Sequence, residues 1–319
     1  MDMSDLTLVF FVRARQFNIQ KLVDHYSSLS CRKVIYDSSD DHISEDDISK
    51  LKSKNFEYVW LGAVNFLIAK NLAFSNVKTK FVMDCTDDDL FLLSSIKNSL
   101  VFLRDNPDYV SCQGREYWYN SANKVLSRET DINGYKKILD EDPHSENWIE
   151  RIKINFSPFT GIAHSMHNTK FHLENNRFLL ENLNYRSGVW EELIPGILSA
   201  LQGNRKIISD IWVVRHRLDQ FNGSRYRLDR ISQYVNDFYN GVKEAVTDDV
   251  NLKPICEYIS NIKDYDFNLC FDLIKSSIDG MSSFSKNAAG KSAEIDPNEE
   301  IVDIINIMNS IDITNLEKE

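Results

Sequence analysis

Residues 80–90 read KFVMDCTDDDL, an apolar run that ends abruptly in a group of aspartates. Such a run is typical of a buried strand of a parallel sheet, and it would deliver its acid groups to the carboxyl end of that strand. Like charges close together raise each other's pKa and cost stability, so we expect a positive group among them. A divalent cation with oxygen ligands, completed by substrate phosphates, is the commonest such group. The acidic residues are Asp84, Asp87, Asp88 and Asp89.

The same aspartates would also suit a structural role. Asp is favoured at helix N-caps and near the positive end of the helix dipole, and residues 94–104 have the apolar spacing of a helix. An exposed acidic turn that caps this helix is therefore the alternative interpretation. A calcium loop of the EF-hand type does not fit, because the glycine and the glutamate that it needs are missing.

The composition of the 319-residue chain is that of an ordinary globular protein, with 42% hydrophobic and 27% charged residues. A net charge of −11 argues against a nucleic-acid partner, because such binders normally present a basic face. We expect no signal peptide and no membrane span, and therefore a cytoplasmic protein with at most a peripheral association with the inner face of the membrane. The five scattered cysteines fit reduced thiols better than disulfides or zinc.

The N-terminal part alternates strand and helix patterns. The apolar run Leu6–Val12 predicts a strand covered on both faces, residues 18–28 follow helical spacing, and residues 33–36 predict a second strand. This is the βαβ unit of a parallel sheet, in which ligands bind beyond the carboxyl ends of the strands. Arg15 and Asp37 follow these two strands, so we expect them at the same edge as the acidic run.

Asp37 opens a polar turn that continues through Ser38. A carboxylate at a strand end could accept hydrogen bonds from the base or ribose of a nucleotide. A solvated turn rich in Ser and Asp explains the same residues equally well. Farther along, residues 120–148 are mostly polar, and their apolar residues show neither helical nor strand spacing. This predicts a long loop or partly helical insertion that covers the site.

The middle of the chain also carries strand and helix patterns. Residues 56–61, 109–119 and 162–166 predict strands, and residues 65–73 predict a helix.

A second informative stretch lies in residues 190–217. It predicts a helix that begins near Glu191 and ends at Gly203, followed by a strand over residues 210–214 that leads to His216. Glu191 and Glu192 are the two carboxylates at the helix start. They suit either compensation of the helix dipole or the role of general base toward an attacking hydroxyl.

The C-terminal part has a helical character. Amphipathic helices are predicted over residues 228–242, within 252–278 and from Ile301 onward, with a flexible linker near 281–299. We therefore divide the chain into a nucleotide-sugar-binding catalytic domain over residues 1–222 and a helical region over residues 223–319. The last helix must bury its apolar stripe on this protein or on a partner, which leaves a homo-oligomer through the C-terminal helices open.

Residues 6–220 resemble bacterial inverting glycosyltransferases of the GT-A type, in the group related to family 2. The most specific likeness is FVMDCTDDDLFLLSSIKNSLVFLRDNPDYVSCQG, which resembles the strand, DXD-type motif and following helix of that group. LVFFVRARQFNIQKLVDHYSS resembles its first strand, turn and helix, and IYDSSDD its acidic nucleotide-contacting turn. The segment EELIPGILSALQGNRKIISDIWVVRHR resembles the part with the acceptor-side carboxylate. The resemblance implies an α/β fold with a mostly parallel mixed sheet flanked by helices.

The resemblance also implies roles for single residues. Asp87 and Asp89 would form the DXD pair that holds Mn²⁺ or Mg²⁺, and His216 aligns loosely with a late residue that reaches the metal or the diphosphate. Glu192, or its neighbour Glu191, would be the catalytic base. The donor-binding residues would be Arg15, Asp37, Ser38, Asp87 and Asp88.

The implied activity is transfer of a hexosyl or related sugar, with inversion, from a nucleotide-sugar donor such as a UDP-sugar. The acceptor would be a hydroxyl of a glycan or lipid-linked glycan in bacterial surface polysaccharide synthesis, for example of a capsule or O-antigen. Two departures from the family pattern leave the donor open: the usual Gly near the metal strand is absent, and Arg15 follows Ala rather than Asn. The alternatives are a non-catalytic nucleotide-binding or scaffold module, and a sugar nucleotidyltransferase, which would need a glycine-rich loop where this chain reads VRARQFN.

Overall fold

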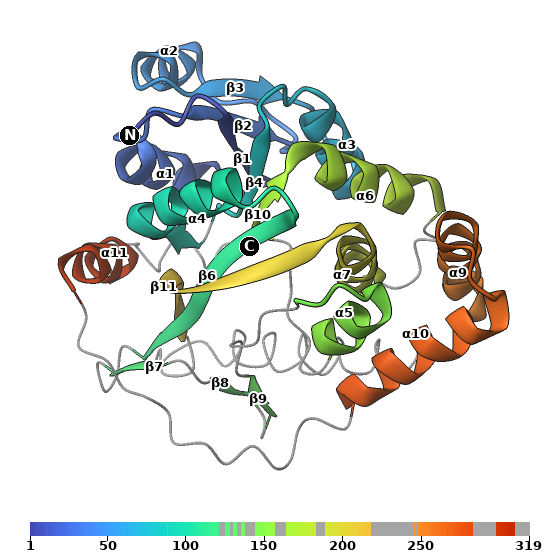
Figure 1. The fold of residues 1–319 in the computed structure, drawn as a ribbon. Coiled ribbons are helices and arrows are strands. Elements are labelled where there is room, and N and C mark those ends of the chain that lie inside the picture. Colours follow the sequence, from blue (N-terminus) through green and yellow to red (C-terminus); the bar gives the residue numbers. More distant parts are fainter. Residues whose placement is uncertain are drawn as a thin grey trace.

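The computed structural model describes residues 1–87, 89–120, 125–127, 130–132, 135–137, 144–156, 164–182, 189–217, 245, 248–282 and 298–309. Within these residues the chain forms one mixed sheet of nine strands, with helices packed against its faces (Figure 1). The predicted α/β fold is confirmed, as is the helical C-terminal region. The predicted boundary at residue 222 lies outside the described residues.

The order of the strands explains where a site can form. Four neighbouring strands, β3, β2, β1 and β4, are parallel, and β10 is then antiparallel to both β4 and β6. Strand β11 is parallel to β6, and the short β5 is antiparallel to β11. In order across the sheet, the strands are β3 (Glu57–Trp60), β2 (Arg32–Asp37), β1 (Leu6–Val12), β4 (Phe81–Cys85), β10 (Met166–Asn168), β6 (Tyr109–Asn120), β11 (Asn204–Arg217) and β5 (Leu90–Phe91), with β7 (Val125–Ser127) beside β6.

The central strand β1 shows why the sheet is covered on both faces. Successive side chains of a strand point to opposite faces. Leu8 and Phe10 join the core beneath the helices α1 (Ile19–Tyr26) and α4 (Leu93–Asp105). Val9 joins a second cluster with Phe74 of α3 (Phe66–Ser75). Because both sets are buried, the strand reads as a continuous apolar run, and its predicted bounds match the observed ones.

The helices of the described chain agree with most of the predicted ones. Three helices were not predicted, α2, α5 and α6, because their apolar residues are interrupted by polar ones. In chain order the helices are a 3₁₀ turn (Gln16–Asn18), α1 (Ile19–Tyr26), α2 (Glu45–Ser53), α3 (Phe66–Ser75), α4 (Leu93–Asp105), α5 (Trp148–Asn155), α6 (Thr169–Asn182), α7 (Trp190–Gln202), α9 (Asp249–Lys263), α10 (Phe267–Ser282) and α11 (Glu299–Asn309).

Some predicted elements differ from the structure or lie outside it. Strand β10 begins at Met166, because residues 164–165 form a turn and a bend; residues 162–163 of the predicted strand lie outside the described residues. The described parts of residues 120–148 contain β7 and a small hairpin of β8 (Thr130–Ile132) and β9 (Tyr135–Lys137), with the first turn of α5 at their end. The predicted helix over residues 228–242 lies outside the described residues.

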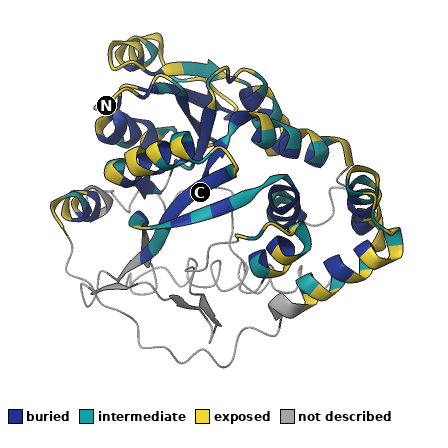
Figure 2. Ribbon diagram, viewed as in Figure 1, coloured by how far each residue is buried: buried dark blue, intermediate teal, exposed yellow. Residues whose placement is uncertain are grey.

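The helices α5, α7, α9 and α10 share a second large core. Trp190 and Ile194 of α7 pack there with Leu252 and Ile255 of α9 and Ile274 of α10. Figure 2 shows these helices with their buried sides turned toward one another. The C-terminal helices therefore fix the start of α7, where the two candidate base residues lie. None of the helices in the described part of the chain has the length and apolarity needed to span a bilayer.

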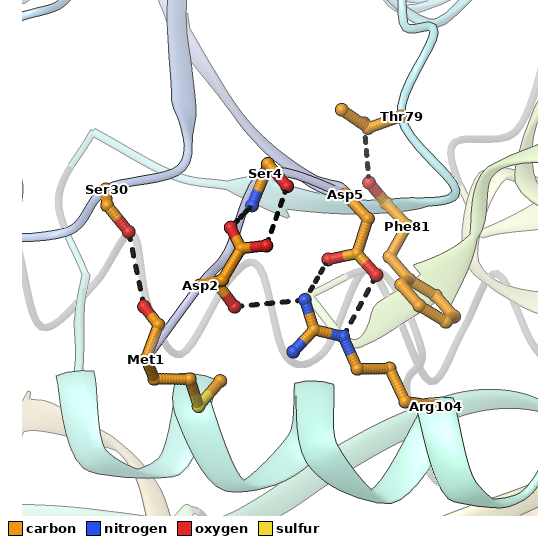
Figure 3. A network of polar contacts seen from close by, with 8 residues as sticks. All are labelled: Met1, Asp2, Ser4, Asp5, Ser30, Thr79, Phe81 and Arg104. Atoms are coloured by element: carbon orange, nitrogen blue, oxygen red, sulfur yellow. Dashed lines mark hydrogen bonds and ion pairs between the residues drawn. The ribbon is translucent and has the colours of Figure 1, made fainter.

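A polar cluster holds the other end of β1, opposite to the acidic run. The guanidinium group of Arg104, near the end of α4, donates to both carboxylate oxygens of Asp5 at 3.0 and 2.5 Å and to the carbonyl of Asp2 at 3.0 Å (Figure 3). The amide of Phe81 donates to the Asp5 carbonyl at 2.9 Å. The amino ends of β1 and β4 are thus fixed to α4.

The last helix, α11, packs against the sheet-bearing core. Ile301 and Ile304 are buried in the same cluster as β1 and α4. The carboxylate of Glu300 accepts hydrogen bonds from the amides of Leu93 and Ser94 at 2.5 and 3.2 Å, and from the Ser94 hydroxyl at 2.6 Å. The apolar stripe of α11 is therefore buried against the core of this same chain. Its residue Glu300 also caps the N-terminus of α4, which lies far away in the sequence.

This cap shows that the aspartates do not start the helix. The residue at the N-cap of α4 is Leu92, which has no side-chain cap, and β5 lies between the aspartates and the helix. The interpretation of residues 87–89 as a helix-capping turn is therefore wrong. Leu92 is a poor cap, so the helix amides need another acceptor, and Glu300 is that acceptor.

Replacing Glu300 by alanine is expected to lower the free energy of unfolding by about 1 kcal/mol, because two amides of the first turn of α4 lose their acceptor. Chemical denaturation followed by circular dichroism measures this loss. Glu299→Ala is the matched control, since it removes the same charge from an exposed position one residue earlier. Equal losses in the two variants would contradict a capping role for Glu300.

Candidate active site

The carboxyl ends of β1, β2 and β4 lie at one edge of the sheet. Asp37, the last residue of β2, pairs with Val12 at the end of β1, and Asp84 in β4 pairs with Val9 of β1. We call residues 86–89, between β4 and β5, the acidic turn; residue 88 lies outside the described residues. Because these strands are parallel and adjacent, the acid groups predicted to meet do lie at the same edge.

Arg15 reaches the acidic turn directly. One of its guanidinium nitrogens lies 2.6 Å from Oδ1 of Asp87, whose side chain is 1% exposed while that of Arg15 is 37% exposed. The preceding Ala14 adopts the left-handed conformation with φ of 56°, which is uncommon for a residue other than glycine. Its amide donates to the Ser39 hydroxyl at 2.9 Å, so a bond to the loop after β2 helps to hold the turn that presents Arg15.

The carboxylate of Asp37 is buried and fully engaged by the protein. Its Oδ2 accepts from Gln16 Nε2 and from the Tyr58 hydroxyl, both at 2.6 Å, and its Oδ1 accepts from the Ser39 amide at 2.9 Å. Burial, and then the neighbouring Asp37, raise the pKa of Tyr58, so this hydroxyl stays protonated and remains the donor. Asp37 thus organises the loops that follow β1 and β2, and a nucleoside would have to share one of these bonds.

Ser38 and Trp60 complete this corner of the edge. The Ser38 amide donates to the Val12 carbonyl at 2.9 Å, which joins the ends of β1 and β2. Trp60, at the end of β3, donates from its indole nitrogen to the Ser39 carbonyl at 3.0 Å, and its side chain is 45% exposed. A fixed, half-exposed aromatic ring therefore lies beside the Asp37 loop.

Two residues of α1 bind the backbone of β5, directly after the acidic turn. His25 Nε2 lies 2.8 Å from the Phe91 carbonyl, and the Phe91 amide donates to the Tyr26 hydroxyl at 2.9 Å. Within the turn, the Asp89 amide donates to Thr86 Oγ1 at 3.2 Å. The backbone on both sides of the aspartates is therefore fixed by hydrogen bonds; Asp88 itself lies outside the described residues.

Lys70 of α3 provides a second cation at this edge. Its Nζ lies 2.7 Å from Oδ2 of Asp84, and the two side chains are 14% and 4% exposed. Together with Arg15, Lys70 supplies the positive charge that the sequence led us to expect among the aspartates. Buried carboxylates need such partners, since an unpaired buried charge is strongly destabilising.

The two candidate base residues lie in the first turn of α7, as predicted. Burial raises the pKa of Glu191 above its ordinary value, Lys70 lowers it, and Glu192 raises it further. Burial therefore makes the Glu191 carboxylate more basic than an exposed one.

His216 lies near the end of β11, and only its backbone is described. Val214 of β11 pairs with Leu90 in an antiparallel register. The pairing with β5 ends there, and His216 itself pairs with Tyr119 of β6. The role of His216 implied by the resemblance stays a prediction.

The described residues could supply only some of the ligands of a divalent cation, and the substrate would have to supply the others. Among them, no three His, Cys, Asp or Glu side chains form a group that could hold a metal ion. Asp87 and Asp89 supply carboxylate oxygens, and Mg²⁺ or Mn²⁺ usually takes one or two carboxylates and fills its shell with water and phosphate oxygens. The donor set thus suits a cation that arrives with a diphosphate, and it would compete with Arg15 for Asp87.

Several of these residues were not predicted from the sequence. Gln16, Tyr58 and Lys70 join the edge through the tertiary fold, because each lies on a different element from the acid group that it contacts. The one sequence signal for Lys70 is that it is the single charged residue in the mostly apolar segment FLIAKNLAF of α3.

One cavity of the described chain lies elsewhere. It has a volume of about 400 Å³ and lies between α6 and α9, where Phe178, Tyr258 and Glu257 are among its lining residues. None of the acidic-edge residues lines it. It is therefore a separate surface feature.

No protein-family model matches this chain, and no curated protein matches it. The chain is similar to the solved structure of S. aureus TarS, with a TM-score of 0.49 and 14% identity, over 89% of this chain and 44% of that one. It is similar to TarS 1-349 in complex with UDP-GlcNAc, with a TM-score of 0.46 and 13% identity, over 93% and 97% of the two chains. It is also similar to the mannosyltransferase PcManGT from Pyrobaculum calidifontis in complex with GDP-Man and Mn²⁺, with a TM-score of 0.45 and 11% identity, over 90% and 76%. The chain spans less than half the length of the full TarS chain, and likeness at this level says nothing about a shared substrate.

Proposed function

We propose that this protein is a glycosyltransferase that moves a sugar from a nucleotide-sugar donor to an acceptor hydroxyl. The observation that carries the proposal is the acidic edge itself, where Asp37, the Arg15–Asp87 pair and the Asp84–Lys70 pair lie at adjacent parallel strands. The crevice beyond the carboxyl ends of such strands is where open α/β sheets bind nucleotides.

The donor would lie along the loops after β1 and β2. Trp60 offers an exposed aromatic ring beside the Asp37 loop, against which a nucleobase could stack. Arg15 is the exposed member of its ion pair, and a guanidinium group binds phosphate oxygens in a bidentate manner. A donor diphosphate near the acidic turn would therefore meet Arg15 first.

Asp87 and Asp89 would hold the divalent cation, Mn²⁺ or Mg²⁺, with Asp88 and His216 as the further candidates from the resemblance. When bound, such a cation neutralises charge on the two phosphates of the departing nucleoside diphosphate. The chain's own residues then keep the carboxylates in place, since His25 and Tyr26 fix the strand after the turn.

The proton of the acceptor hydroxyl would pass to a carboxylate at the start of α7. Glu191 is favoured over Glu192, because burial raises its pKa. A general base works best when its pKa is raised toward the working pH. Attack from the side opposite to the leaving diphosphate would invert the configuration of the sugar.

The finer assignments extend this proposal. The donor class is a UDP-sugar or a related nucleotide sugar, and the acceptor is a glycan or a lipid-linked glycan of a bacterial surface polysaccharide. The protein would work in the cytoplasm, in contact with the inner face of the membrane where a lipid-linked acceptor is used. A homo-oligomer would use the C-terminal helices other than α11, whose apolar side is buried against the core.

A thermal-unfolding screen of nucleotides and nucleotide sugars, with and without Mn²⁺, tests the proposal. A ligand at 100 times its dissociation constant is expected to stabilise the protein by about 2.7 kcal/mol. We expect the largest shift for one nucleoside diphosphate or its sugar conjugate in the presence of Mn²⁺. The absence of a shift with any nucleotide would refute the function, and binding without any transfer would favour the non-catalytic module.

A further inference from the structure

Arg15 and Asp87 form an ion pair between two turns of the acidic edge. Arg15 follows β1, and Asp87 lies in the acidic turn after β4, the strand that pairs with β1. One guanidinium nitrogen of Arg15 lies 2.6 Å from Oδ1 of Asp87. The pair therefore joins the two turns on which the proposed diphosphate site depends.

The two side chains of this pair are buried to very different extents. The side chain of Asp87 is 1% exposed, whereas that of Arg15 is 37% exposed. A buried carboxylate without a compensating cation is strongly destabilising, so Asp87 needs a positive partner in every state of the protein. An exposed guanidinium group loses little free energy when it leaves an ion pair, because water solvates it. Asp87 can therefore exchange its cation, and Arg15 is the member of the pair that moves.

The backbone that carries Arg15 is held by hydrogen bonds, which leaves the movement to its side chain. The carbonyl of Arg15 accepts from the Asn18 amide at 2.9 Å. The next residue, Gln16, donates from Nε2 to Oδ2 of Asp37 and to the Asp41 carbonyl, both at 2.6 Å. A change of partner by Arg15 therefore needs only rotation about its side-chain bonds.

The guanidinium group of Arg15 and a divalent cation compete for the Asp87 carboxylate. With a guanidinium nitrogen 2.6 Å from Oδ1, a cation bound to Asp87 would be repelled at short range by a like charge. A diphosphate changes this balance, because it attracts both groups. Its oxygens bind a guanidinium group in a bidentate manner, and they complete the coordination shell of Mn²⁺ or Mg²⁺.

We propose that Arg15 is a gate for the cation: its guanidinium group occupies Asp87 in the free protein and moves to the donor phosphates when they bind, which releases Asp87 for the divalent cation. This inference rests on the proposed function and names the form of the donor that the acidic edge accepts. That form is a nucleotide sugar bound together with its cation, not a cation first and a donor second. No covalent bond changes, since the Arg15–Asp87 pair is replaced by one pair between Arg15 and phosphate and one between Asp87 and the cation.

The first test measures the binding of Mn²⁺ alone, by the loss of the electron paramagnetic resonance signal of the free ion. Arg15→Met, which removes the competing charge, is expected to bind Mn²⁺ about tenfold more tightly than the unmodified protein, a coupling of ordinary size. Arg13→Met removes the same charge from an exposed position on the same turn and is expected to leave the affinity unchanged. A merely structural ion pair predicts the opposite sign, because its loss would disturb Asp87. Unchanged or weaker binding in Arg15→Met would overturn the proposal.

A double variant shows where the additional Mn²⁺ binds. When Arg15→Met is combined with Asp87→Asn, the gain in affinity is expected to disappear, because the carboxylate that the gate protects is gone. A gain that persists would place the cation elsewhere and overturn the proposal. If Arg15→Met fails to fold, Arg15→Gln replaces it, since its neutral amide can still donate to Asp87.

The second test measures the binding of inorganic pyrophosphate by titration calorimetry, with EDTA present to remove divalent cations. Arg15→Met is expected to bind pyrophosphate about tenfold more weakly than the unmodified protein, the loss expected for one charge-assisted hydrogen bond. Equal binding would overturn the proposal, because Arg15 would then have no phosphate partner to move to. A protein that binds no nucleotide in the thermal screen would refute the proposed function, while the Mn²⁺ titrations still decide whether Arg15 blocks Asp87.

Discussion

Replacing Glu191 by glutamine is expected to lower the rate of transfer by about 10²- to 10⁴-fold, the usual contribution of a general base. The amide has nearly the same shape but cannot accept the proton of the attacking hydroxyl. Because burial raises the pKa of Glu191 above its ordinary value of 4.5, the unmodified protein should lose activity as the pH falls through that raised value. Initial rates with a nucleotide-sugar donor, measured across the pH range, check both points.

Glu192→Gln is the matched control for this prediction. It makes the same change one position later in the same helical turn, and its carboxylate raises the pKa of Glu191. Its replacement should therefore shift the acid limb to lower pH and leave most of the activity. A large loss in Glu192→Gln with little loss in Glu191→Gln would reverse the assignment and make Glu192 the base.

Donor binding separates a chemical role from a structural one. In Glu191→Gln we expect the nucleotide-induced rise in melting temperature to be retained, because Glu191 acts on the acceptor and not on the diphosphate. A simultaneous loss of nucleotide binding would show that the substitution disturbs the donor edge. The role as base would then lose its support.

The sequence predicts the parallel part of the sheet well, because strands covered on both faces read as continuous apolar runs. Leu6–Val12 illustrates this, since the alternating side chains Leu8 and Val9 are both buried but in different clusters. The carboxyl ends of such strands meet at one edge for topological reasons, so the proximity of Asp37 and the acidic turn is also predictable from the pattern. The pattern of apolar runs therefore predicts the backbone framework of the site.

The partners of these acid groups could not be predicted in the same way. The charges that compensate the aspartates come from Arg15 and Lys70, which lie on two separate elements, and each pair forms only after the sheet has assembled. We expected a metal ion as the positive group on general grounds, whereas the described residues supply two side-chain cations. Their identity depends on long-range packing, on which periodicity carries no information.

The same limit applies to the end of the chain. The apolar spacing of α11 predicts an amphipathic helix, but it cannot say which surface the stripe covers. In the structure, Glu300 caps α4, because the N-cap residue of that helix, Leu92, has no side chain that can accept a hydrogen bond. Two local deficiencies, an uncapped helix and an unpartnered stripe, are thus resolved together by a contact between distant residues.

Replacing Asp89 by alanine is expected to abolish transfer and the Mn²⁺-dependent part of nucleotide binding, while the fold stays intact. The amide of Asp89, not its carboxylate, makes the bond to Thr86 that closes the acidic turn, so truncation of the side chain leaves that bond in place. Its carboxylate would be one of two that hold the cation, and loss of such electrostatic stabilisation costs about 10²- to 10³-fold or more in rate. Titration calorimetry with UDP, with and without Mn²⁺, measures the binding.

Asp105→Ala provides the control for charge alone, because Asp105 is an exposed aspartate at the end of α4 and away from the acidic turn. We expect it to bind and turn over like the unmodified protein. Unchanged turnover in Asp89→Ala would refute the metal role of the acidic turn, since the described residues offer no larger group of metal-ligating side chains to take its place. Retained nucleotide binding that no longer responds to Mn²⁺ would instead support it, because Arg15 and the Asp37 loop remain to hold the donor.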